Sequence, residues 1–198
     1  MEELVREFLR TSLFGSYYNP KKDNYDPVDT AINRAYRDFC RTIRIDKEYN
    51  QRIKQKGIGA CKDKASPIIK DAIAVVTTKE FEKWHTDLCS NLIKVGYSFG
   101  QAQKWINMTL KYLIVLDYPD VIKIQDKLHA PIDTDVIEKA IAENIVEEKK
   151  EYYIPWSTDN LNKSKYDKFQ SQIKTKVKGM SRIEWEFQAW NDSSAKDE

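Results

Sequence analysis

The chain has few of the residues on which many catalytic sites depend. Its 198 residues include two histidines and three cysteines, and no two cysteines form a Cys-x-x-Cys pair. Zinc ribbons and iron–sulfur clusters need closely spaced thiolates, so neither is predicted. The sequence also lacks a phosphate-binding P-loop and a dinucleotide-binding fingerprint. We therefore expect no metal site and no cofactor.

Long apolar runs are also missing. No stretch approaches the roughly 18 apolar residues that cross a bilayer. The start, Met-Glu-Glu-Leu-Val-Arg, lacks the basic and apolar regions of a signal peptide. Cys40, Cys61 and Cys89 are odd in number and far apart, which favours free, buried thiols in a reducing compartment. We expect a cytoplasmic protein without a membrane partner, and its oligomeric state stays open.

Charge of one sign is not in excess over the whole chain. Thirty-three Lys and Arg residues nearly balance 31 Asp and Glu residues, so the net charge is +2. A basic patch can still be local. Arg34, Arg37, Arg41 and Arg44 recur every three or four residues and would share one helix face. Such a face suits DNA phosphates, and the alternative is an ordinary solvated face.

The hydrophobic pattern is helical almost throughout, and strand-like alternation is nearly absent. The predicted helices cover residues 2–14, 28–44, 46–57, 67–76, 77–95, 100–117, 133–150, 159–177 and 181–190. Pro67 is expected to open one helix, Thr77 or Thr78 to cap the next, and Gly96 to end it. The fold class is thus all-α. We expect one domain over residues 1–191, with two lobes meeting near 96–136 as the alternative, and a frayed tail over 192–198.

The region from Gly96 to Val136 combines two chemically useful groups. Gly96 separates two predicted helices, and the second opens with Gly100-Gln101-Ala102-Gln103-Lys104. Its stripe of Ile106, Leu110, Leu113 and Leu116 predicts that this helix is the most buried one. Pro131-Ile132-Asp133 then begins a third helix. One amine and one carboxylate are therefore expected near two helix N-termini.

These motifs resemble the helix-hairpin-helix element of the DNA glycosylase superfamily. Members commonly show Gly-x-Gly-x-Lys followed by a Val-Asp or Ile-Asp segment, and the spacing here is closest to the archaeal 8-oxoguanine glycosylase type. The resemblance covers residues 79–140. Ala102 stands where a second glycine is usual, and no cluster cysteines follow.

The resemblance implies a function. Lys104 would be the nucleophile that attacks the sugar of a flipped nucleotide, and Asp133 its carboxylate partner. The residues expected to bind DNA are Gly96, Gly100, Gln101, Ala102 and Gln103, together with the arginine stripe. A position in the first turn of its helix and burial beside Trp105 would both lower the pKa of Lys104.

Each assignment has a structural alternative. Lys104, Asn107 and Lys111 also fit a solvated helix face, and Asp133 is an ordinary helix cap by sequence. His129 could orient Asp133 or a phosphate, or lie in a surface loop. The competing function is a helical module that binds nucleic acid or protein without catalysis. The predicted partner of the enzyme is DNA.

Overall fold

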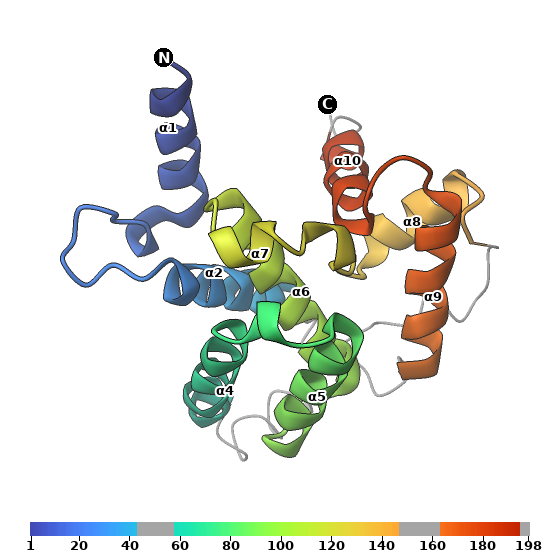
Figure 1. The fold of residues 1–198 in the computed structure, drawn as a ribbon, viewed down its shortest axis with the longest axis horizontal. Helices are drawn as coiled ribbons and strands as arrows, with labels where there is room; N and C mark the ends of the chain where they lie inside the picture. Colours follow the sequence, from blue (N-terminus) through green and yellow to red (C-terminus); the bar gives the residue numbers. More distant parts are fainter. Residues whose placement is uncertain (43–57, 147–162, 195–198) are drawn as a thin grey trace.

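The computed structural model describes residues 1–42, 58–146 and 163–194, and every regular element in these residues is a helix (Figure 1). The helices pack around shared apolar clusters into a compact unit. The predicted all-α class is therefore confirmed. No helix within the described ranges is both long and apolar enough to cross a membrane.

The helices follow one another with short connections. Their bounds are α1 Glu2–Phe14, α2 Pro27–Thr42, α4 Ile58–Ile73, α5 Phe81–Lys94, α6 Phe99–Val115, α7 Pro119–Ile122, α8 Thr134–Ala142, α9 Lys163–Lys176 and α10 Arg182–Ser194. Three short 3-10 turns lie between them: η1 Gly15–Tyr17, η2 Val76–Thr78 and η3 Gln125–Lys127. The predicted helix over residues 46–57 falls outside the described residues. Helix α10 continues into the predicted tail as far as Ser194.

Helix α6 lies at the centre of the fold, between α2 and α5 (Figure 1). Fourteen consecutive residues, 100–113, are buried, and Leu113 is 0% exposed. The indole of Trp105 donates a hydrogen bond of 3.1 Å to the carbonyl of Ile32 on α2. The prediction that this helix is the most buried one is confirmed. Neighbouring helices cover the polar side chains of α6 as well as its apolar stripe.

The predicted starts of α4 and α5 are wrong. Pro67 lies inside α4 instead of opening it. Ala65, Ile69 and Ile73 all lie in the core on one side of this helix, so packing compensates for the hydrogen bond that proline cannot make. Glu80, not Thr77 or Thr78, caps α5: its carboxylate accepts hydrogen bonds from the N–H groups of the second and third helical residues.

The buried apolar side chains form two clusters. The larger one gathers side chains of α2, α4, α5 and α6, and the smaller one gathers side chains of α8, α9 and α10. Phe99, at the start of α6, packs against both. Polar side chains of α5, α6 and α9 meet between these clusters, where the candidate site lies.

The cysteines fit the expected buried thiols only in part. Cys89 is buried and Cys40 is exposed, and both are free. The side chain of Cys61 lies outside the described residues.

Candidate functional site

Lys104 and Asp133 are in direct contact, although 29 residues separate them. The Lys104 amine donates to Oδ2 of Asp133 over 2.5 Å. The lysine side chain is 3% exposed and the aspartate side chain 18%. The two residues that the sequence selected therefore form one buried amine–carboxylate pair. The solvated-face alternative for Lys104 is wrong, because α8 and α10 bring acidic side chains to this flank of α6.

Lys104 does not lie in the first turn of its helix. Ser98 caps α6, and Ser98 and Gln101 exchange hydrogen bonds in a capping box. The helix thus begins at Phe99, and Lys104 is its sixth residue. The field of the helix dipole falls off within the first turn. The expected influence of the helix N-terminus on this amine is therefore weaker than the sequence indicated.

Asp133 has two structural roles. Its Oδ1 accepts a 3.0 Å hydrogen bond from the N–H of Val136, so it caps α8 as predicted. Its Oδ2 receives the Lys104 amine. Burial raises the pKa of this carboxyl, but Lys104, the Val136 N–H and nearby Lys111 outweigh burial, and the pKa lies below its usual value. Asp133 is therefore a carboxylate at neutral pH. Helix α8 ends at Ala142, short of the predicted Lys150.

A second buried pair lies beside the first. Lys111 donates to Oε1 of Glu186 over 2.8 Å, and Glu186 is 1% exposed. Burial raises the pKa of the Glu186 carboxyl, and Lys111 opposes that shift only in part. The Lys111 amine also lies over the rings of Phe187 and Trp190. Glu186 was not predicted from the sequence, because nothing in the residues of α10 indicates that Lys111 on α6 is its partner.

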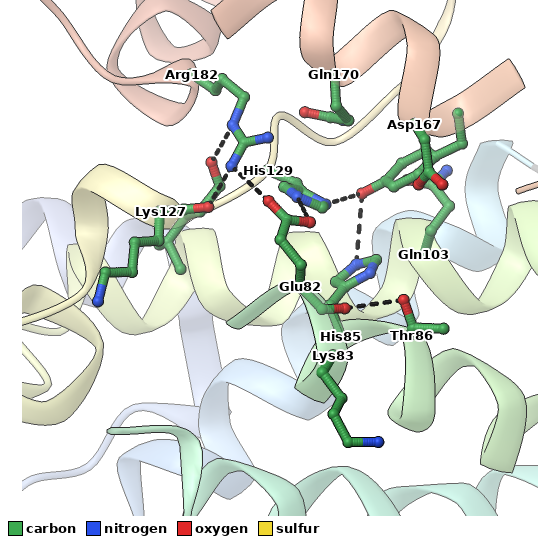
Figure 2. Close-up of polar contacts among 12 residues, drawn as sticks. Glu82, Lys83, His85, Thr86, Gln103, Lys127, His129, Asp167, Gln170 and Arg182 are labelled. Atoms are coloured by element: carbon green, nitrogen blue, oxygen red, sulfur yellow. Dashed lines mark hydrogen bonds and ion pairs between the residues drawn. The ribbon is translucent and has the colours of Figure 1, made fainter. Parts of the chain in front are cut away.

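His129 is buried, so the surface-loop alternative is wrong. It is 3% exposed. Its Nε2 lies 2.8 Å from Oε2 of Glu82, and its Nδ1 lies 2.7 Å from the Tyr166 hydroxyl (Figure 2). Burial lowers the pKa of His129, so the ring is neutral at pH 7. The contact with His129, helped by Arg182, lowers the pKa of Glu82 to about 2. His129 thus faces Glu82 and Tyr166 and not, as the sequence suggested, Asp133.

Hydrogen bonds extend from His129 back through α6 to α5. Asn107 donates to Tyr166 over 2.8 Å and to Gln103 over 3.1 Å. The amide oxygen of Asn107 therefore faces Nε2 of His85, 3.0 Å away, as an acceptor. Tyr166 is left to donate its hydroxyl proton to Nδ1 of His129, which places the ring proton on Nε2, toward Glu82. The result is a directed chain of hydrogen bonds from His85 through Asn107 and Tyr166 to His129, whose Nε2 lies 2.8 Å from Glu82.

The segment that leads to Asp133 is fixed from outside by α9 and α10. Arg182 donates from Nε to the carbonyl of Leu128 over 3.1 Å and from Nη2 to the carbonyl of Lys127 over 2.5 Å (Figure 2). Gln170 forms two hydrogen bonds with the backbone of Ala130. Asp133 is therefore positioned by residues that neither spacing nor motif could identify.

Comparison with known proteins found no protein that shares this arrangement of residues. No family model, characterised protein or solved structure matches the chain. The helix-hairpin-helix element accordingly stays a prediction for residues 96–104. What the arrangement can do follows from its chemistry: a primary amine and an ionised carboxylate touch each other at the junction of two apolar clusters.

The residues predicted to contact DNA near the hairpin have several internal roles. Gly96 adopts a positive φ of 106° after the end of α5, as predicted. Gly100, Gln101, Ala102 and Gln103 are all buried. Gln101 completes the capping box, so its N–H, at one of the residues expected to bind DNA, already donates to the Ser98 hydroxyl. Trp105 packs against the rings of Tyr36, Phe39 and Tyr97 in the larger cluster.

The predicted arginine stripe is not uniform. Arg34 pairs with Asp38 and donates over 2.8 Å to the carbonyl of Leu13, so it is occupied inside the protein. Arg37 is exposed and lies over the ring of Tyr17. The side chain of Arg41 and all of Arg44 lie outside the described residues. Of the two arginines whose side chains are described, Arg37 is the one whose guanidinium faces solvent.

Proposed function

We propose that this protein is a DNA glycosylase with an associated lyase activity, in which Lys104 is the nucleophile and Asp133 the carboxylate partner. The observation that supports the proposal is the 2.5 Å contact between the two groups. Such a pair can form a covalent intermediate with a sugar while balancing the positive charge that develops on it. The described residues supply both groups from separate helices.

The chemistry starts when the Lys104 ammonium loses a proton to solvent and the resulting free amine attacks C1′ of an extruded nucleotide. The C1′–N bond to the base breaks, and the base leaves with the bonding electrons and takes up a proton. A proton then passes from the lysine nitrogen to O4′ as the sugar ring opens, which gives an iminium. Asp133 stays ionised and stabilises the positive charge on C1′ as the base departs. Elimination of the 3′ phosphate from the iminium completes the lyase step.

The burial of the pair sets a condition on this reaction. Because the Lys104 side chain is only 3% exposed, a nucleotide reaches its amine only after neighbouring atoms move. Enzymes of this chemistry also extrude their target base from the duplex. Formation of the covalent intermediate should therefore be slower than DNA binding and should follow a conformational step.

Borohydride trapping on duplex DNA with assorted base lesions tests the proposal. Borohydride reduces the iminium to a stable C–N bond, so the parent should become crosslinked to a cleavable substrate. Lys104→Gln and Lys104→Arg should both abolish crosslinking, and the arginine keeps a cation beside Asp133. Asp133→Asn should keep the cap of α8 but lose most of the rate. Lys94→Gln, on the exposed end of α5, is the matched control and should crosslink like the parent.

A second candidate function also has an observation in its favour. A buried lysine paired with an aspartate is a common structural element, and removal of either partner destabilises a protein without any catalytic role. The chain would then be a non-enzymatic helical module that binds nucleic acid or protein. If the parent binds DNA but crosslinks to no lesion, this second function replaces the first.

A further inference from the structure

Helix α9 and the two residues after it, Val177 and Lys178, are rich in basic charge. Residues 163–178 contain six lysines and one aspartate, whereas the whole chain has a net charge of only +2. The buried side of α9 consists of Tyr166, Phe169, Gln170 and Ile173. The lysines of α9 lie on its outer side and on both flanks: Lys168 is on the outer side, Lys163 and Lys174 are on one flank, and Lys165 and Lys176 are on the other. Five of them are exposed: Lys163, Lys168, Lys174, Lys176 and Lys178. We call these five residues the α9 lysine face.

Most of these cations have no acidic partner in the part of the chain that the structure describes. Lys163 pairs with Asp167 within the helix. Lys168, Lys176 and Lys178 have no ion pair among the described residues. Like charges gathered on one helix repel each other, so this arrangement costs stability in the free protein. A polyanion placed across the face would relieve that repulsion.

Two basic residues near the N-terminal helices differ in this respect. Arg34 pairs with Asp38, and Lys70 lies 2.6 Å from Asp26 and 2.7 Å from Asp29. These two cations already have acidic partners, so they are poorer candidates for contacts with phosphates than the α9 lysine face.

The inner side of α9 contacts the segment that carries the candidate site. Tyr166 reaches Asn107, one turn along α6 from Lys104. Gln170 holds Ala130, three residues before Asp133. A strand bound along the outer side of α9 would therefore lie one helix diameter, about 10 Å, from the residues that position Asp133.

We infer that the α9 lysine face binds the phosphate backbone of duplex DNA. This inference rests on the proposed function and names the surface that holds its substrate. From Lys163 to Lys176 the helix extends roughly 20 Å, which matches about six base pairs of duplex at 3.4 Å each. Lysine is a point cation that suits phosphate contact without base recognition, so binding through this face is independent of sequence.

Salt-dependent binding to a fluorescein-labelled duplex tests the inference by anisotropy. The variant Lys168→Gln/Lys176→Gln/Lys178→Gln removes three exposed cations and avoids Lys174, which shares a hollow with Asp126 and Glu184. Removal of one lysine–phosphate interaction should lower the slope of log K against log salt by about 0.9. The triple variant should therefore reduce that slope by up to about 2.7 and bind more weakly at low salt.

The matched control is Lys21→Gln/Lys22→Gln/Lys94→Gln, which makes the same change in net charge at exposed residues away from α9. It should keep the parent's slope. Equal slopes for the two triple variants would overturn the inference and leave the proposed function standing if the parent still crosslinks to DNA. A reduced slope in the α9 variant alone, with no crosslinking by the parent, would support DNA binding by the α9 lysine face and overturn the proposed glycosylase activity. No binding of duplex by the parent would overturn both.

Discussion

The side-chain amide of Gln170 satisfies both backbone groups of Ala130. The N–H of Ala130 donates to Oε1 over 3.1 Å, and Nε2 donates to the Ala130 carbonyl over 2.7 Å. Both residues are buried, at 2% and 0% exposed. This contact joins α9 to the segment that leads to Asp133. The position of the carboxylate therefore depends on a helix that follows it in the chain.

Removal of these two hydrogen bonds should be costly. Gln170→Met keeps the length of the side chain but leaves a buried N–H and a buried carbonyl without a partner. Each such group costs about 1–3 kcal/mol, so we expect a loss of about 2–6 kcal/mol in the free energy of unfolding, measured with urea. Gln125→Met, at an exposed residue of η3, should change it by less than about 0.5 kcal/mol. A similar small change at both residues would contradict the assigned role of Gln170.

The Lys104–Asp133 pair should show strong coupling in a double-mutant cycle. Lys104→Gln leaves a buried carboxylate without its cation, and Asp133→Asn leaves a buried ammonium without its anion. Breaking a buried pair costs about 3–5 kcal/mol for a single variant. The double variant should recover part of this loss, because neither charge remains. Urea unfolding of the parent and three variants gives the coupling energy, and a value below about 0.5 kcal/mol would mean that the contact is energetically negligible.

The sequence allowed prediction of the parts of this fold that depend on local pattern. The apolar stripe of α6 predicted its central position, and Leu110 and Leu113 are 1% and 0% exposed. Asp133 precedes a helical run, and an aspartate there commonly caps. Even the Lys104–Asp133 contact followed from residue types and spacing, once a family resemblance had suggested which residues to pair.

The missed features depend on contacts between distant segments. His129 looked like a loop residue because burial by Tyr166, 37 residues away, leaves no local signal. The capping box that moves the start of α6 uses Ser98, which precedes the apolar pattern. Pro67 lies inside α4, so packing outweighs the preference of proline for the first turn of a helix. Glu186 and Gln170 were missed for the same reason, since each acts on a partner in another helix.

Leu113 should be among the most sensitive apolar residues. Its side chain is completely buried on the central helix, so Leu113→Ala removes buried apolar atoms and leaves a cavity. Such changes cost about 2–5 kcal/mol. Ile93→Ala provides a control, because Ile93 is 44% exposed near the end of α5. Thermal unfolding should separate the two variants clearly. A loss at Leu113 no greater than that at Ile93 would contradict the central placement of α6.

The two buried histidines should make the protein sensitive to mild acid. Burial lowers the pKa of His85 well below its usual value, and the nearby ring of His129 acts in the same direction. Burial also lowers the pKa of His129, despite the opposing effect of Glu82. Between about pH 6.5 and the lowered values, the unfolded chain binds protons that the folded chain does not. Stability is therefore complete above about pH 6.5 and falls as the pH decreases below it.

The two histidines act in a different pH window from Glu82. Two histidines contribute a slope of at most about 2.7 kcal/mol per pH unit, and that slope should begin as the pH falls below about 6.5. Glu82, with its pKa of about 2, loses its contribution only as the pH falls from about 4.5, so it leaves this window unchanged. Urea unfolding at pH 7, 6 and 5 measures the slope. His85→Gln and His129→Gln should each reduce it, and His85→Gln should do so more, because the pKa of His85 is lowered further. A parent whose stability is constant from pH 7 to 5 would show that neither ring is held neutral by the fold.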